Sequence, residues 1–316
     1  MKATGAEAMS KYKKNKNIKW IAFILIIAVV GGGIWYGFTS LRRGPYMENI
    51  LAIGGNSNVE LLKELNDNWM LPEDYSLEIK EVDGIKMEWV QKKNTIPDKA
   101  ILQLHGGAYI RSLKDNGITY RRAAVQYAKL SGAGVLTVDY RVAPEHPYPA
   151  ALEDAVLAYK WLLEQGYPPE YIIIAGDSAG GGLALATALY IRDNNMPMPA
   201  AIITMSAWTN LNYRRRTPAY VGSNRADNPY ISPVYGEYSG FPPMLMQVGG
   251  DEILLNDTIK VAQKAKEAGV AVRQTTYPGM FHVFQMLFPK LPEANMAWDE
   301  VEAFIKDIYA EKQEVK

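Results

Sequence analysis

The segment at residues 171–180 restricts the possible folds of this chain more than any other. Residues 171–175 form an apolar run of strand length, and residues 176–180 follow at once as Gly-Asp-Ser-Ala-Gly. A serine between glycines directly after a buried strand is typical of a sharp strand-to-helix turn that holds the hydroxyl clear of the backbone. Gly176 and Gly180 leave room for that turn. The pattern predicts strand, turn and helix around Ser178, although five residues alone also occur by chance.

A general base for Ser178 has few candidates, because the chain contains only three histidines, His105, His146 and His282. Only His282 follows Ser178, as the chain order serine, acid, histidine requires. It comes after a strand-like run at residues 270–277, where a loop can present it at the edge of a sheet. A structural histidine in a loop is the alternative. His146 lies between two prolines, which favours a rigid loop contact for that residue.

The acid that orients the imidazole is expected at a strand end between the serine and the histidine. Asp251 fits, because it follows an apolar run at residues 244–248 and two glycines. Glu252 and Asp257 are close rivals, but a helix is expected to begin near residue 254, and acids in a first helical turn usually face solvent or the helix dipole. Asp227 lies in a polar loop without a preceding strand. The sequence therefore favours Asp251.

Backbone amides are expected to stabilise the oxyanion that forms during acyl transfer. The residue after the nucleophile, Ala179, supplies one amide. A second source is the sequence His-Gly-Gly-Ala at residues 105–108, which follows a predicted strand at residues 100–104. Glycines in such a loop let the backbone approach the substrate. Both elements in one chain, in the expected order, favour acyl-transfer chemistry at Ser178.

With these residues together, the chain resembles the hormone-sensitive lipase group of α/β-hydrolase esterases, which includes bacterial carboxylesterases and arylacetamide deacetylase. The similar region covers about residues 99–288. Its motifs are His-Gly-Gly-Ala-Tyr at 105–109, Asp-Tyr-Arg-Val-Ala-Pro-Glu-His-Pro-Tyr-Pro-Ala at 139–150, Gly-Asp-Ser-Ala-Gly-Gly at 176–181, Pro-Tyr-Ile-Ser-Pro at 229–233, Gly-Asp at 250–251 and His282.

The resemblance implies a Ser-Asp-His triad beside an oxyanion hole of backbone amides. Ser178 is then the nucleophile, His282 the general base and acid, and Asp251 the carboxylate that orients the imidazole. Because the imidazole must be unprotonated to accept the serine proton, activity is expected to fall at acidic pH. The implied oxyanion donors are Gly106, Gly107, Ala108 and Ala179.

Two acidic residues are expected to support the catalytic loops without reacting. The resemblance places the Ala-Pro-Glu-His-Pro loop beneath the active site, so Glu145 is expected to be a buried brace. Asp177, next to the nucleophile, is expected to cap the following helix or to bond to a neighbouring loop. Ala108 stands where the family usually has a third glycine. The alanine keeps the backbone donor, but its methyl group is expected to narrow the acyl pocket.

Short apolar runs alternate with helical patterns after residue 70, which predicts a mostly parallel sheet with helices on both faces. The resemblance implies the α/β-hydrolase fold for residues 45–316, with a small helical cap formed by residues 45–70 and 207–235. Strands are expected at 77–82, 87–91, 100–104, 134–139, 171–175, 201–205, 244–248 and 272–277, and helices at 120–130, 150–164, 180–192, 256–268 and 294–310.

The first 38 residues predict an N-terminal transmembrane helix that acts as a signal anchor. Five lysines lie within residues 11–19, and residues 20–38 are uncharged. A helix of that length spans about 30 Å, the thickness of a bilayer core. Lysines before the span outnumber Arg42 and Arg43 after it, so the short N-terminal segment is expected in the cytoplasm and the catalytic domain outside the cell membrane. Cleavage as a signal peptide, with secretion, is the alternative.

Composition excludes several other functions. The chain has no cysteine, which rules out disulfides and thiol catalysis, and its formal net charge is +0, with no broad basic footprint for nucleic acid. No His-Glu-x-x-His or Gly-x-Gly-x-x-Gly motif follows a strand, so neither a metal nor another cofactor is expected. Residues 214–216, three arginines, are expected to be a solvated surface, with an anionic substrate group or lipid headgroups as the alternative.

These patterns together predict a serine carboxylesterase that hydrolyses small-molecule esters with short-to-medium acyl groups through an acyl-enzyme. Two alternatives stay open. One is another acyl hydrolase on the same fold, such as a lipase, thioesterase, lactonase or peptidase. The other is a noncatalytic binding protein of this fold.

Overall fold

The structure, a computed structural model, describes residues 69–212, 218–287, 289 and 291–313. The predicted membrane segment at 20–38, the first cap element up to residue 68 and the arginines at 214–216 lie outside the described residues. Within the part of the chain that the structure describes, none of the helices combines the length and the apolar character needed to cross a membrane.

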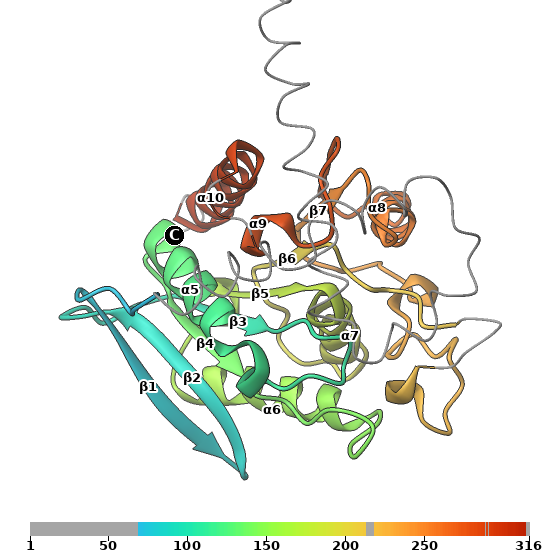
Figure 1. The fold of residues 1–316 in the computed structure, drawn as a ribbon, viewed down its shortest axis with the longest axis horizontal. Helices are drawn as coiled ribbons and strands as arrows, with labels where there is room; N and C mark the ends of the chain where they lie inside the picture. The colour runs from blue at the N-terminus through green and yellow to red at the C-terminus, as the bar shows by residue number, and fades with distance from the viewer. Residues whose placement is uncertain (1–68, 213–217, 288, 290, 314–316) are drawn as a thin grey trace, which may run out of the picture.

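A single eight-stranded sheet forms the centre of the described region, in the order β1-β2-β4-β3-β5-β6-β7-β8 (Figure 1). The strand β2 pairs antiparallel with β1 and β4, and every other pairing is parallel. The strands are β1 Tyr75–Val82, β2 Ile85–Lys92, β3 Ala100–Leu104, β4 Gly134–Val138, β5 Ile172–Asp177, β6 Ala201–Met205, β7 Met244–Gly249 and β8 Val272–Tyr277.

Helices cover both faces of the sheet (Figure 1). Side chains of α5 and α10 pack on one face, and side chains of α6, α7 and α8 pack on the other. The strands β3 to β7 are fully buried between these layers, which explains why most of their residues are apolar. The helices are α5 Leu113–Ser131, α6 Ala150–Glu164, α7 Ser178–Asp193, α8 Leu255–Glu267, α9 Phe284–Leu287 and α10 Pro292–Gln313.

The predicted strands and the mostly parallel sheet are confirmed, and the main differences lie at helix starts. The helix α5 begins at Leu113, seven residues before the predicted start, where Asp115 accepts a hydrogen bond from the Ser112 amide at 3.2 Å. The helix α7 begins at Ser178 itself. The four-residue α9 was not predicted.

The described part of the predicted cap at 207–235 packs against the helical face that holds α7. Leu211, Tyr220, Val221 and Ile231 are all buried in the same core cluster as α6 and α7. Two short 3-10 helices, Ala219–Val221 and Pro233–Tyr235, carry part of this segment. Whether the segment acts as a cap stays a prediction.

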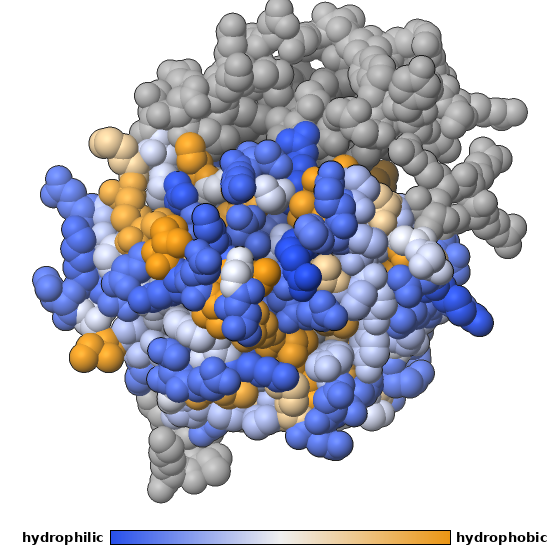
Figure 2. All heavy atoms as spheres, turned by 90° about the horizontal axis from the view of Figure 1, so that it is seen from below, coloured by the Kyte–Doolittle hydropathy of each residue, from blue (hydrophilic) through white to orange (hydrophobic). Residues whose placement is uncertain are grey.

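The surface of the molecule carries scattered hydrophobic side chains. Figure 2 shows a largely hydrophilic face with hydrophobic residues in small groups. Among the described residues, Ile96, Met70 and Ile253 are 96%, 83% and 70% exposed. Single exposed side chains of this kind are normal on globular proteins and indicate no particular partner.

The parallel strands bring distant parts of the sequence to one edge of the sheet. Because β3, β5, β6, β7 and β8 run in the same direction, the residues that follow them meet at the carboxyl edge. The glycine loop follows β3, Ser178 follows β5, Ser206 follows β6, Glu252 lies three residues beyond β7, and His282 lies five beyond β8. This edge is therefore the place to look for a site.

Candidate active site

Ser178 lies at the sharp turn between β5 and α7. Its φ of 52° is in the left-handed region, which is uncommon for a residue with a side chain. The turn needs its glycines, because a Cβ on Gly176 would lie 2.2 Å from the Gly180 carbonyl oxygen, and one on Gly180 would lie 2.0 Å from that of Leu104. The strand, turn and helix predicted around Ser178 are confirmed.

A chain of hydrogen bonds joins Ser178, His282 and Glu252. The Ser178 Oγ lies 2.9 Å from His282 Nε2, and His282 Nδ1 lies 3.1 Å from Glu252 Oε1. The His282 side chain is 18% exposed, whereas that of Glu252 is fully buried. A carboxylate on one imidazole nitrogen and a hydroxyl on the other is the arrangement that lets histidine take a proton from serine.

The structure places Glu252, and not the predicted Asp251, beside His282. Asp251 is exposed, and its amide donates to the Met280 carbonyl oxygen at 2.9 Å, while the neighbouring Glu252 turns inward to His282. The prediction placed Glu252 in the first turn of a helix. In fact α8 begins at Leu255, so Glu252 lies in the preceding turn, where its side chain points into the protein.

Three groups hold the Glu252 carboxylate. Besides the contact to His282, its Oε2 accepts hydrogen bonds from the Ser206 hydroxyl at 2.7 Å and from the Gly249 amide at 2.9 Å. The Ser206 oxygen in turn accepts a hydrogen bond from the Val283 amide at 3.0 Å. Sequence reasoning missed Ser206 and ranked Glu252 behind Asp251; the positions of Ser206 and Glu252 just after β6 and β7 were the available signal.

The glycine loop after β3 lies against the nucleophile turn. The Gly106 amide donates to Tyr120 Oη at 2.7 Å and to Asp177 Oδ1 at 3.1 Å. Because this amide is already engaged, the structure does not support Gly106 as an oxyanion donor. The next residues take left-handed backbone conformations, with φ of 120° at Gly107 and 57° at Ala108. Both residues are partly exposed.

Asp177 joins the nucleophile turn to the glycine loop. It is buried and accepts hydrogen bonds from the Gly106 amide and from the Tyr120 hydroxyl, the latter at 3.2 Å. Its side chain does not cap α7, so the loop contact is the correct one of the two predicted roles. Burial raises the pKa of Asp177 to about 6, although the hydrogen bonds from Tyr120 and Gly106 oppose the rise. Burial also holds the pKa of Tyr120 well above its usual value, so that hydroxyl stays a donor.

His105 orders the glycine loop and does not act as a second base. Its ring is fully buried and stacks on Tyr140 with centroids 3.9 Å apart. Burial lowers the pKa of His105 to about 4, which keeps the imidazole neutral. The Nδ1 lies 2.7 Å from the Gly106 carbonyl oxygen and therefore carries the proton.

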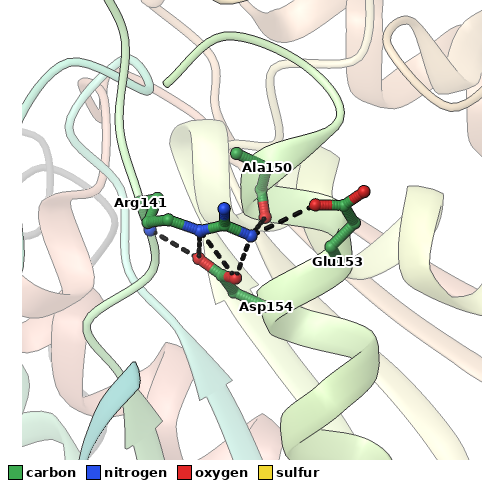
Figure 3. A network of polar contacts seen from close by, with 4 residues as sticks. All are labelled: Arg141, Ala150, Glu153 and Asp154. Carbon is green, nitrogen blue, oxygen red and sulfur yellow. Dashed lines mark hydrogen bonds and ion pairs between the residues drawn. The ribbon is translucent and has the colours of Figure 1, made fainter. Parts of the chain in front are cut away.

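The loop that contains Glu145 is held by other residues than predicted. Glu145 is exposed, so it is not the expected buried brace. Figure 3 shows Arg141 instead, with its guanidinium 2.7 Å from Asp154 and 3.1 Å from Glu153. Asp154 is 2% exposed and also accepts the Arg141 amide at 2.8 Å. The loop reaches the glycine loop through its backbone, where the Ala143 amide donates to the Tyr109 carbonyl oxygen at 2.8 Å.

The residue types at this site are suited to acyl transfer. A serine hydroxyl, an imidazole and a carboxylate in series can deliver a nucleophile at neutral pH. Among the described residues no group of three or more histidine, aspartate or glutamate side chains is placed to hold a metal ion.

Comparisons with known proteins show the family of this chain. Residues 101–286 match the family model described as the alpha/beta hydrolase fold. An acetyl-hydrolase of Streptomyces hygroscopicus is 37% identical over 239 residues, covering 69% of this chain and 79% of that protein. An esterase of Acinetobacter venetianus is 31% identical over 258 residues, covering 74% of this chain and 84% of that protein.

Solved structures show the same likeness. The crystal structure of an esterase/lipase from an uncultured bacterium has a TM-score of 0.73 at 33% identity and covers 92% of this chain and 99% of that chain. An esterase from the bacterial hormone-sensitive lipase family has a TM-score of 0.71 at 30% identity and covers 90% of this chain and 97% of that chain.

The fold and the serine, histidine and carboxylate in series define a serine hydrolase. The chain belongs to the α/β-hydrolase fold family and, within it, to the hormone-sensitive lipase group of esterases. The protein is a carboxylic ester hydrolase, as the resemblance in its motifs predicted.

Proposed function

We propose that Ser178, His282 and Glu252 are the catalytic triad of this esterase. The observation that carries the proposal is the unbroken series of contacts from Ser178 Oγ through both ring nitrogens of His282 to Glu252 Oε1. His282 takes the serine proton as Oγ attacks the ester carbonyl carbon. Glu252 orients the imidazole and stabilises it once it is protonated.

Backbone amides stabilise the negative charge on the carbonyl oxygen. Gly106 is engaged with Tyr120 and Asp177, so the donors we assign are Gly107, Ala108 and Ala179. Ala179 lies in the first turn of α7, where amides have no partner within the helix and the helix dipole favours negative charge. Fixed donors of this kind need no reorganisation during the reaction.

The acyl-enzyme forms and is hydrolysed in two balanced steps. In the first, the Oγ–carbon bond forms, the ester C–O bond breaks, and His282 gives its proton to the departing alkoxide. In the second, His282 takes a proton from water, which attacks the acyl carbon, and then returns a proton to Ser178 Oγ as that bond breaks. The products are a carboxylic acid and an alcohol.

We propose that the substrates are esters with small acyl groups. Ala108, in the loop that follows β3, carries a methyl group at a position where the family usually has glycine. This methyl group is expected to narrow the acyl pocket. One relative is an acetyl-hydrolase, and the crystal of another esterase, with a TM-score of 0.71 and 35% identity, was soaked with p-nitrophenyl butyrate. A series of p-nitrophenyl esters tests the proposal: acetyl and butyryl esters should react faster than long-chain esters, and the reverse order would contradict it.

The triad is tested with Ser178→Ala. The variant should lose esterase activity by more than about 10⁴-fold and should not react with a fluorophosphonate. Labelling of the wild-type protein at Ser178, found by peptide mass spectrometry, completes the test. A wild-type protein that the fluorophosphonate does not label would point to a noncatalytic protein of this fold.

We also propose that residues 20–38 anchor the esterase in the cell membrane with its catalytic domain outside. The support lies in the sequence, since a span without charges follows a lysine-rich segment. Membrane fractionation with N-terminal sequencing tests this. Recovery of the full chain in the membrane fraction, accessible to protease from outside, is the expected result, and a mature protein that starts just after residue 38 would contradict it.

A further inference from the structure

Ser206 lies between two parts of the proposed triad that come from different strands. Its hydroxyl donates to Glu252 Oε2 at 2.7 Å and accepts from the amide of Val283, the residue directly after His282, at 3.0 Å. Ser206 is fully buried and follows β6, the strand between β5 and β7. One side chain therefore contacts both the acid and the loop that carries the histidine.

The direction of these hydrogen bonds follows from the donors available. The Val283 amide can only donate, so the Ser206 oxygen accepts there, and the single hydroxyl proton is left for Glu252. Glu252 Oε2 also receives the Gly249 amide at 2.9 Å. With two donors on Oε2, the other oxygen, Oε1, is the one turned to His282. The hydroxyl thus helps to fix the orientation of the carboxylate relative to the imidazole.

The backbone on both sides of this contact is under strain. Ser206 has a φ of 54° and Val283 a φ of 52°, both in the left-handed region. For a β-branched residue such as Val283 this conformation is a true outlier, and it persists only when the surroundings hold it. The Ser206 amide donates to the Gln247 carbonyl oxygen at 2.8 Å, and its hydroxyl accepts from the Val283 amide. Ser206 therefore helps to stabilise both strained conformations.

We propose that Ser206 is a positioning residue for ester hydrolysis: its hydroxyl fixes the Glu252 carboxylate and the His282 loop relative to each other. This inference rests on the proposed triad. Removing the hydroxyl leaves the Val283 amide without its acceptor and Glu252 Oε2 with one donor fewer, so the imidazole is held less well in the geometry that takes the Ser178 proton. Because Ser206 is fully buried, we expect it to make no contact with the substrate.

The test compares Ser206→Ala and Ser206→Gly with Ser232→Ala in the full chain. Ser232 is a matched control, because it is also fully buried and accepts a backbone amide, that of Leu211, at 2.8 Å without touching the triad. Both Ser206 variants should lower kcat for p-nitrophenyl acetate about tenfold with KM changed less than about twofold, and Ser232→Ala should leave kcat unchanged.

The glycine variant separates positioning from a merely structural role. Glycine adopts a positive φ without strain, so Ser206→Gly should unfold at a higher temperature than Ser206→Ala while having the same reduced kcat. If kcat followed the unfolding temperature instead, so that the glycine variant recovered activity, the proposal would be overturned. A kcat for Ser206→Ala within about twofold of the wild type would overturn it as well.

A double-mutant cycle tests whether Ser206 acts through Glu252. In a Glu252→Ala background, Ser206→Ala should lower kcat by less than about threefold; a full additional tenfold loss would contradict the inference. Fluorophosphonate labelling keeps this result apart from the triad itself. If Ser178 of the wild-type protein is labelled but Ser206→Ala behaves like the wild type, only the inference about Ser206 fails, whereas an unlabelled wild type would refute the triad.

Discussion

Replacing Glu252 with glutamine is the sharpest test of which carboxylate serves His282. The side chain is fully buried and has three partners: His282 Nδ1 on Oε1, and Ser206 and the Gly249 amide on Oε2. Glutamine has one acceptor oxygen. If that oxygen faces Ser206 and Gly249, its amide group faces Nδ1 and favours a proton on Nε2, which can then no longer accept the Ser178 proton.

The opposite orientation of the glutamine is also unfavourable, because its amide group then meets the Gly249 N–H. Either way a hydrogen bond to a charged group is lost, which costs about 2 kcal/mol of stability. A wrong imidazole tautomer in a Ser-His-acid triad lowers kcat by about 10⁴-fold, so we expect a loss of about 10³- to 10⁴-fold for Glu252→Gln.

The matched variant is Asp251→Asn, one residue away. Asp251 is exposed, so its substitution should change the free energy of unfolding by no more than about 0.5 kcal/mol and kcat by less than about twofold. The assay is steady-state hydrolysis of p-nitrophenyl butyrate, with active sites counted by fluorophosphonate labelling. The reasoning is refuted if Asp251→Asn loses activity as severely as Glu252→Gln, or if Glu252→Gln keeps more than about a tenth of it.

Three further substitutions test the surroundings of the triad. Ala108→Gly removes a side chain at a φ of 57° and should raise the free energy of unfolding by about 1 kcal/mol in urea titration; a lower value would contradict the strain at this position. Burial raises the pKa of Asp177 to about 6, so the folded protein binds a proton more tightly than the unfolded chain and loses stability as the pH rises from about 4 to about 6. Asp177→Asn should not show that loss, which in the wild type is up to about 3 kcal/mol of the free energy of unfolding. If the unfolding temperature of the variant depended on pH as that of the wild type does, this account would be refuted. Arg141→Met leaves the buried Asp154 without its cation and should cost about 3 kcal/mol by chemical unfolding, whereas a neutral effect would show that the ion pair is dispensable.

Much of the fold could be predicted because its strands carry a strong local signal. The central strands are buried on both faces, so each is a mostly apolar run of strand length, and all the predicted strands are present. The start of α5 was missed because Lys114, Asp115, Asn116 and Gly117 give no apolar periodicity there. The helix begins at Leu113 because the Ser112 amide donates to Asp115 at 3.2 Å and the Leu113 amide donates to Asp139, the residue after β4, at 2.8 Å.

The position of the acid was predicted to within one residue, and the turn after β7 explains the difference. Strand order and glycines predicted a carboxylate just after β7, but two acidic residues stand there side by side. Which of them turns inward depends on how the chain leaves the strand after Gly249, and that path is set by contacts with the segment after β8, such as the hydrogen bond from the Asp251 amide to the Met280 carbonyl oxygen. The engagement of Gly106 with Tyr120 and Asp177 depends likewise on residues distant in sequence.

Three residues in or beside the proposed triad have a strained backbone conformation, and this strain links activity to the stability of the sheet. Ser178, Ser206 and Val283 all have φ between 52° and 54° and lie after β5, β6 and β8. Each such conformation costs about 1 kcal/mol or more and persists only because the neighbouring structure determines it. The strands β5 and β6 are fully buried and hydrogen-bonded on both sides, so they can hold the turns that follow them. Glycine would relieve the strain at any of these positions, but at Ser178 and Ser206 it would remove the hydroxyl on which the proposed reaction depends. We therefore expect stabilising substitutions at this edge of the sheet to lower activity, and those elsewhere in the core to leave it unchanged.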